Sequence, residues 1–530
     1  MSIVQSILAG EVTFSSHGKI LLGNPVDWSR LGKLEKNLEF RLHSFRWARP
    51  LLQSRDDRTI SYWDDILLRW HAEYGDINRE FGFALWERLL PKDIAARISN
   101  FRKTPARGKA LWFDRLGPWN DHATAQRALE ITERIKLGNY SPELYEIAKS
   151  HLSLLKRKDF FRGHHNHGLQ QTQALFELGH ALQDSHAMTL AEGRFEDHVQ
   201  HTVNEDGVLN EQSTAYQGYS LRILQQMLAS FQTKNVKVSP FCTRRIELME
   251  WLIHCSRLSS GAFISLGDGG LSGTYEPMKL KPVGAPTSMP NHEIIEAEDL
   301  RIDVFKDEFL FVRHWGNGRD KLHNFHFALA LQAKRALHGH EDGGAPVLYW
   351  NGQPILLAFG LYRYGVTNAK RTHNREREGQ NTIVPLPSSD IKTFRFRNAQ
   401  LEDLSINNGQ VTFTYRAYRH KCEWRRHFSI NPAEGIIRIE DHFDGSFDTL
   451  YRFDPSLTTD ITPGKFCARN EKIKIEAVWN DPSTQAQIFK GSEEPMLGWH
   501  SPSYGEFKSA PVLRHTWQNK ASLELRLALN

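Results

Sequence analysis

The chain has 530 residues, which is enough for about two to four domains with substantial hydrophobic cores. Its 67 Lys and Arg residues against 62 Asp and Glu residues leave a formal net charge of +5, without a basic tail or a Lys/Arg run. We therefore expect no nucleic-acid partner, although a locally basic cleft that faces an acidic polymer remains possible. No run of about 18 apolar residues occurs, so we expect no membrane span.

The N-terminus and the cysteines bear on the cellular compartment. The first 14 residues have no basic segment, and their apolar run of about seven residues is interrupted by Gln5 and Ser6, so we expect no signal peptide. The four cysteines form no C-x-x-C pair and are expected to be reduced, buried thiols. This favours a cytoplasmic protein. A periplasmic or secreted chain trimmed of its signal has the same pattern.

Residues 30–260 repeat apolar side chains with the period of a helix nearly throughout. The predicted helices are 34–52, 61–74, 122–137, 142–157, 169–184 and 220–231. Short turns such as 137–141 separate them. This pattern is typical of helical hairpins that are stacked in series.

The stretch GHHNHG (163–168) stands directly before the predicted helix 169–184. It is a weak metal motif, because adjacent residues rarely bind one ion together and no carboxylate follows in the next turns. Asn166 can instead cap the helix, with the histidines as polar surface residues. Alternatively, an amide beside an imidazole at a helix start can bind a carboxylate and take a proton. The residues alone leave these alternatives open.

Two later polar stretches also carry candidate groups. Tyr216 follows the polar segment EQST at the start of an amphipathic stretch, where a structural and a catalytic role are both possible. In HGHEDGG (338–344), His338 and His340 share one face if the segment is extended. With Asp342 they resemble the HxHxD motif of metallohydrolases, so a half metal site and a proton relay both remain possible.

The pattern changes around residues 275–300. The segment 279–293 contains three prolines and no periodicity, which indicates a linker or a domain edge. The predicted strands beyond it are 307–315, 324–332, 346–359, 411–419, 435–443 and 522–529. Helices followed by strands predict an all-α domain (1–285) and then an antiparallel β-sandwich (286–530).

Several short motifs occur together in a specific order along most of the chain. They are Asp27-Trp28, NLEFRLHSF (37–45), PWNDHATAQR (118–127), NHG (166–168), EQSTAY (211–216), LGDGG (266–270), HGHEDGG (338–344), GLYRYG (360–365) and QNTIV (380–384). In this order the chain resembles the heparinase II/III-like polysaccharide lyases, whose other branches cleave alginate and related uronates. The resemblance implies an incomplete (α/α) toroid followed by a β-sandwich, which agrees with the periodicity.

The resemblance also implies a reaction, the cleavage of a glycosidic bond to O4 of a uronic acid by β-elimination. Such an enzyme must neutralise the uronate carboxylate, remove the C5 proton and protonate the leaving oxygen. Asn166 would bind the carboxylate, and His167 would be the base or a second carboxylate ligand. Tyr216 would be the acid and, in a syn elimination, also the base. A positive charge on His338 would lower the pKa of Tyr216 for this second role.

The resemblance places the active site between the toroid and the sandwich, with an acidic polysaccharide as the partner. The residues expected to contact this substrate are Trp119, His122, Arg127, Glu211 and His340. For His122 and Arg127 an equally weighted alternative is a structural or surface salt bridge.

Zinc-containing relatives bind the ion with the second histidine of HxHxD, an aspartate and a later histidine. Here the first of these is His340, but Ala358 and Gln380 stand at the other two positions. Alanine cannot coordinate a metal, so we expect no zinc in the sandwich and no other cofactor. His373 is nearby in sequence and is the one possible substitute ligand.

Two other functions compete with the lyase. A glycoside hydrolase on an (α/α) toroid needs two carboxylates, for which Glu205, Asp206, Glu211 and Asp268 are candidates. A non-catalytic factor in polysaccharide binding or biosynthesis would keep the fold without turnover. The uronate polymer, endo or exo action and the oligomeric state stay undecided.

Overall fold

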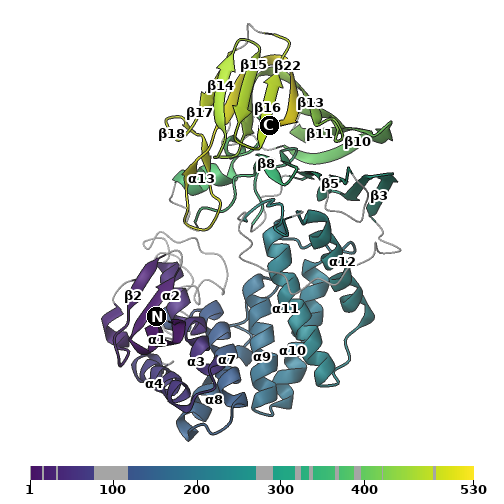
Figure 1. Ribbon diagram of the computed structural model, residues 1–530. Helices are drawn as coiled ribbons and strands as arrows, with labels where there is room; N and C mark the ends of the chain where they lie inside the picture. The colour runs from purple at the N-terminus through teal and green to yellow at the C-terminus, as the bar shows by residue number, and fades with distance from the viewer. Residues whose placement is uncertain are drawn as a thin grey trace, which may run out of the picture. The chain divides into compact units, whose positions relative to one another are not determined.

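The computed structural model describes residues 2–14, 17–31, 34–76, 117–258, 260–269, 291–316, 324–332, 338–363, 369–386, 396–419, 422–481 and 485–530. The chain divides into two compact units. Figure 1 labels their helices and strands. The first comprises Met1–Thr202 and Met227–Ser239, and the second comprises Val203–Gln226 and Pro240–Asn530.

The first unit consists mostly of helices. A short hairpin of β1 (Glu11–Phe14) and β2 (Gly18–Leu21) follows the N-terminal helix α1 (Ile3–Leu8). The later helices are α2 (Lys36–His43), α3 (Arg49–Gln53), α4 (Asp57–Tyr74), α7 (Asp121–Lys136), α8 (Pro142–Lys156), α9 (Asn166–Ala181) and α10 (Ser185–Thr202). Helix α9 lies at the centre, because α7, α8 and α10 all pack against it. Most of its side chains are consequently buried.

Two helices of this unit differ from the prediction. The stretch 34–52 is not one helix: Phe45 has a φ of 62°, which interrupts the helical backbone between α2 and α3. Pro50 then lies in the first turn of α3, where the missing N–H costs nothing. Helix α10 was missed because small alanines and polar side chains, rather than large apolar residues, form much of its buried face.

In the second unit, α11 (Thr214–Thr233, of which residues up to Gln226 belong here), α12 (Pro240–Ser256) and α13 (Ala369–Arg375) accompany two antiparallel sheets. The first has six strands in sequence order: β3 (His292–Ala297), β4 (Leu300–Phe305), β5 (Phe309–His314), β6 (Phe325–Ala330), β7 (Pro346–Trp350) and β8 (Gln353–Leu356). The second sheet has ten strands. Eight of them follow the order β10-β11-β12-β13-β22-β16-β15-β14; in addition, β9 pairs with β13 and β17 pairs with β22.

The strands of the ten-stranded sheet are β9 (Ile383–Pro385), β10 (Arg397–Asn407), β11 (Gln410–Arg419), β12 (Cys422–Asn431), β13 (Ile436–Arg452), β14 (Thr458–Thr462), β15 (Lys465–Arg469), β16 (Ile473–Val478), β17 (Ala486–Phe489) and β22 (Val512–Leu529). The long strands β13 and β22 pair over most of their lengths and form its centre. Short ladders join β18 (Ser492–Glu493) to β19 (Met496–Leu497) and β20 (Trp499–His500) to β21 (Lys508–Ser509).

The two sheets form a sandwich with a shared core. Phe327 of β6 packs against Phe413 of β11 and Phe428 of β12, with ring centroids 6.1 and 5.4 Å apart. The opposite face of the six-stranded sheet is also covered, because Ala328 belongs to a second core with Trp251 of α12. Burial on both faces explains why these strands are continuous apolar runs rather than alternating ones.

The predicted fold class is confirmed: an incomplete (α/α) toroid precedes an antiparallel β-sandwich. The predicted boundary at 285–286 lies outside the described residues and stays a prediction. All four cysteines are free, but Cys422 is exposed rather than buried as expected. Across the described part of the chain, no helix combines the length and the apolar character that crossing a membrane requires.

Candidate functional site

The stretch GHHNHG forms the turn into α9. The helix cap is His165 rather than Asn166, because the His165 Nδ1 accepts a hydrogen bond from the backbone N–H of His167 at 3.2 Å. The interpretation of Asn166 as the cap is therefore wrong. Asn166 is the first helical residue, and its buried Oδ1 has no hydrogen-bond partner among the described residues. A Cβ on Gly168 would lie 2.0 Å from the carbonyl oxygen of Gly163, so this tight turn requires glycine.

Asp121, the first residue of α7, organises the polar groups around this turn. Its Oδ2 accepts from the Nδ1 of His167 at 3.2 Å and pairs with the Nε of Arg162 at 3.0 Å. The ring of His122 stacks on that of His167, with centroids 4.3 Å apart. A buried carboxylate on Nδ1 orients the imidazole and leaves its Nε2 as the reactive nitrogen.

The electrostatics of this cluster favour a charged Asp121 beside neutral His122. Burial raises the pKa of the Asp121 carboxyl, but the hydrogen bond from His167 and the positive charge of Arg162 outweigh it and lower the pKa to about 2. Burial holds the pKa of His122 well below its ordinary value, and the neighbouring His167 adds to this effect. His122 therefore acts as a neutral ring that supports His167.

Replacing Asp121 with Asn should remove one source of acid sensitivity. Because the folded-state pKa of Asp121 is about 2 against an ordinary value of 3.8, its contribution to stability is present above about pH 4 and lost as the pH falls through about 2. Between about pH 5 and pH 2 the wild type should therefore lose about 2 kcal/mol more than the variant. Urea unfolding across this range measures the difference. Asp57→Asn, at an exposed carboxylate, is the control; parallel curves for Asp121→Asn and the wild type would contradict the assignment.

Trp119 and Arg127 lie in the core of the first unit, and both are fully buried. The guanidinium of Arg127 donates to the Nε2 of His151 at 2.9 Å and to the carbonyl oxygen of His43 at 2.6 Å. It also lies over the ring of Trp70, 3.7 Å from the centroid. This geometry does not support the predicted substrate contacts of Trp119 and Arg127, and it favours the structural alternative.

In the second unit, three segments that are distant in sequence meet at the start of α11. The Ser213 hydroxyl accepts from the backbone N–H of Tyr216 at 3.2 Å and donates to the carbonyl oxygen of Asp268 at 2.5 Å. The backbone N–H of Asp268 in turn donates to the carbonyl oxygen of His338 at 2.7 Å. These bonds join the motifs EQSTAY, LGDGG and HGHEDGG.

Asp268 is the centre of this second cluster, and it is fully buried. Its carboxylate accepts from His338 Nδ1 at 3.1 Å and from His340 Nε2 at 2.8 Å. Two nitrogens of the Arg371 guanidinium also donate hydrogen bonds to this carboxylate, at 2.6 and 2.8 Å. Burial raises the pKa of Asp268, but the hydrogen bonds from the two histidines and Arg371 outweigh it and hold the pKa well below its ordinary value.

Tyr216 stacks on His338, with ring centroids 3.4 Å apart and planes inclined by 9°. The Nε2 of His338 lies 3.9 Å from Glu211 Oε2. Burial lowers the pKa of His338 below its ordinary value, although the Asp268 carboxylate acts in the opposite direction. The lowered pKa favours the neutral form of His338, whose Nδ1 faces Asp268. This differs from the expectation of a charged imidazole beside Tyr216.

The HxHxD segment does not form an extended strand, but His338 and His340 still meet on one carboxylate. Asp342 does not join them, because its Oδ2 accepts from the backbone N–H of Gly267 at 3.1 Å. Burial raises its pKa. The segment is thus organised around Asp268, a residue from another part of the chain.

The side chains present do not fit the zinc site of relatives. Ala358 has no donor atom and borders a small cavity with His500 and Ser265. The side-chain amide of Gln380 donates a hydrogen bond to the carbonyl oxygen of Asn374 at 2.8 Å, so this side chain binds the backbone and not a metal ion. His340 already binds Asp268. Burial lowers the pKa of His373, the possible substitute ligand, to about 3, and its ring contacts Phe359.

The resemblance implies roles for His167, Tyr216 and His338 but not for the groups that orient them. Asp268 is a sequence-based candidate only as a hydrolase acid, and Asp121, Arg162 and Arg371 are not among the candidates. Asp121 and Asp268 lie inside quoted motifs, PWND and LGDGG, which was a usable signal. For Arg371, which reaches Asp268 across 103 residues, the sequence contains no such signal.

Solved structures with the same fold include proteins described as heparinase III and as the heparan sulfate lyase HepC. Heparinase III matches with a TM-score of 0.68 and 12% identity over 95% of this chain and 79% of that one. A mutant of the heparan sulfate lyase HepC from Pedobacter heparinus matches with a TM-score of 0.65 and 12% identity, covering 100% of this chain and 82% of that one. The heparinase III BT4657 gene product has a TM-score of 0.65 and 14% identity, with coverages of 96% and 81%.

The chain is therefore a toroid-plus-sandwich protein with the fold of these lyases. Residues 325–514 match the family model described as Heparinase II/III-like, C-terminal. The motifs HGHEDGG, GLYRYG and QNTIV lie within this matched segment. No curated protein sequence matches the chain.

Proposed function

We propose that the protein is a polysaccharide lyase that cleaves a 4-linked uronate by β-elimination. The stack of Tyr216 on His338, with Asp268 behind it, is the observation that carries this proposal. It supplies a phenol stacked on a buried imidazole, which is itself hydrogen-bonded to Asp268. The fold of the heparan sulfate lyases and the family match of the sandwich support the same class of reaction.

In this proposal Tyr216 is the acid, and it gives its hydroxyl proton to the departing O4 oxygen. A neutral His338 suits this role, because an acid needs no nearby cation to lower its pKa. The Asp268 carboxylate fixes the tautomer and the orientation of His338. His338 is thus a support for the tyrosine ring rather than a source of positive charge.

His167 is the base that we propose for the C5 proton. Asp121 binds its Nδ1, so the lone pair on Nε2 is available, and the Asp121 charge stabilises the imidazolium that forms. Asn166 is adjacent, and its buried amide would bind the uronate carboxylate as negative charge builds up during C5 deprotonation. Base and acid are then different residues, and each is oriented by a buried aspartate.

The hydrolase alternative is weakened by the state of two of its four candidate acids, Asp268 and Asp206. A hydrolase needs one protonated and one free carboxyl group on either side of the bond. Asp268 has both oxygens occupied by His338, His340 and Arg371. Asp206 is buried, and its Oδ1 accepts from the backbone N–H of Asn291 at 3.0 Å.

The test is to incubate the purified protein with a panel of uronate polysaccharides. We expect at least one polymer to yield products with the ultraviolet absorbance of a C4–C5 double bond, which hydrolysis cannot form. Because the residues do not fit the zinc site of relatives, a chelator should change this rate by no more than about twofold. Saturated products would contradict the lyase, and a large loss in chelator would contradict the metal-independent mechanism.

A further inference from the structure

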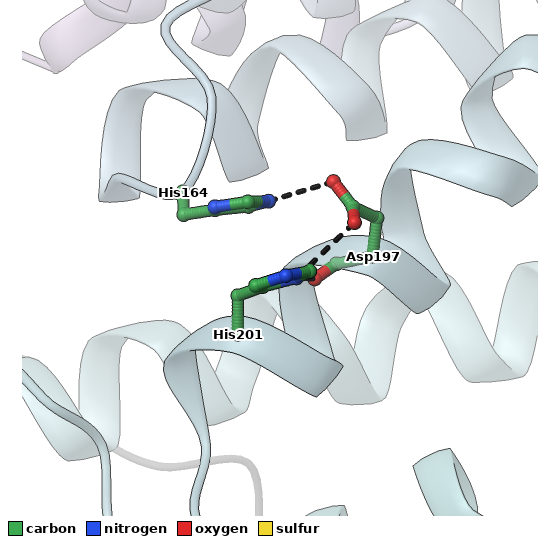
Figure 2. A group of neighbouring side chains, drawn as sticks. All are labelled: His164, Asp197 and His201. Atoms are coloured by element: carbon green, nitrogen blue, oxygen red, sulfur yellow. Dashed lines mark hydrogen bonds and ion pairs between the residues drawn. The ribbon is translucent and has the colours of Figure 1, made fainter.

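His164 has no part in the proposed reaction, yet it lies close to two other side chains that can bind a metal ion, Asp197 and His201. Its Nε2 lies 2.6 Å from Asp197 Oδ2, and the Nδ1 of His201 lies 3.1 Å from Asp197 Oδ1 (Figure 2). The two imidazole rings are stacked, with centroids 4.2 Å apart and planes inclined by 8°. One carboxylate therefore faces two parallel imidazoles.

The three side chains come from two elements of the first unit. Asp197 and His201 are four residues apart on α10 and so share one helix face, while His164 lies in the turn before α9. Within the described ranges, this is the one group of three His, Cys, Asp or Glu side chains whose ligand atoms lie within 4.8 Å of one another.

We propose that His164, Asp197 and His201 bind a divalent transition-metal ion such as Zn²⁺. Two imidazole nitrogens and one carboxylate oxygen are typical zinc ligands, whereas Ca²⁺ and Mg²⁺ require several oxygens. Ligand atoms that lie about 2.1 Å from one ion are at most about 4.2 Å apart, so small side-chain rotations from the observed separations suffice. All three residues are exposed, which leaves the remaining coordination position to water.

Such an ion would connect the turn before α9 to α10. His164 immediately precedes the cap residue His165 in this turn. In the bound form the ion takes the place of the proton between His164 Nε2 and Asp197 and of the proton on His201 Nδ1, which also lies 2.8 Å from the Asp197 carbonyl oxygen; both protons pass to solvent. The ion takes no part in turnover, because none of its three ligands belongs to the clusters around Asp121 and Asp268.

Zinc titration of the full-length protein by calorimetry tests this site. The wild type should bind one Zn²⁺ ion. His201→Gln should bind it at least about 100-fold more weakly, because losing even a residue that only hydrogen-bonds a metal ligand lowers the affinity for the metal 10- to 100-fold. His186→Gln is the matched control, because His186 is exposed on the same helix but outside the group. It should bind like the wild type.

A spectroscopic measurement identifies the ligands independently of folding and of lyase activity. Electron paramagnetic resonance of bound Cu²⁺ should show coupling to two nitrogens in the wild type and to one in His201→Gln. Equal Zn²⁺ affinity in the wild type and His201→Gln, or no binding by the wild type, would mean that the group is only an ion pair and would overturn the proposal.

Discussion

Tyr216→Phe should lower the rate of unsaturated product formation by about 10²- to 10⁴-fold, the usual contribution of a positioned acid. The variant keeps the aromatic ring that stacks on His338, so the fold and substrate binding should be preserved. The loss should therefore appear in kcat rather than in KM. Initial rates from the ultraviolet absorbance of the product measure it.

Tyr219→Phe is the matched control for this experiment. Tyr219 lies on the same helix, is also buried and contacts the Tyr216 ring edge-on, with centroids 6.2 Å apart. Removing its hydroxyl should leave kcat within about threefold of the wild type, because it carries no proton in the proposed reaction. If Tyr216→Phe retained wild-type kcat, the tyrosine mechanism would be abandoned.

Asp268→Asn should destabilise the second unit by about 3–5 kcal/mol, because it removes the carboxylate from a buried ion pair and leaves Arg371 uncompensated. The same change removes the acceptor that orients His338. A variant that still folds should thus lose activity as well. Urea unfolding, followed by circular dichroism at pH 7, measures the stability.

Asp460→Asn is the control for this prediction, since Asp460 is exposed on β14 of the same unit. Its unfolding free energy should stay within about 0.5 kcal/mol of the wild type. Wild-type stability of Asp268→Asn would show that Arg371, His338 and His340 find other partners, and the central role of Asp268 would then be wrong.

The fold was predictable because its signals are local. Apolar periodicity located most of the long helices and six stretches of strand. The Asn-Gly dipeptides 351–352 and 408–409 join β7 to β8 and β10 to β11, and all four residues have the positive φ that such tight turns require. The failures are also local in origin. The break at Phe45 follows from backbone geometry that no residue type there requires, and α10 lacks a strong apolar stripe.

The site was predictable only in part, because its orienting contacts are not local. His167 and Tyr216 were found from motifs. The charge state of His338, in contrast, depends on burial and on Asp268, which is 70 residues away in sequence. The structural position of Arg127 depends on packing against Trp70, and the partners of His164 lie on α10. Periodicity has no information on any of these contacts.

The shell around Asp268 has a consequence for how the protein acquires activity. Its members come from the loop after α12, the HGHEDGG segment and α13, so they become neighbours only after at least the chain from residue 268 to residue 371 has folded. A partly folded chain therefore has a tyrosine but no support that fixes its position. Activity should then return during refolding no earlier than the contacts of Asp268 form, which makes turnover a reporter of the folding of this part of the chain.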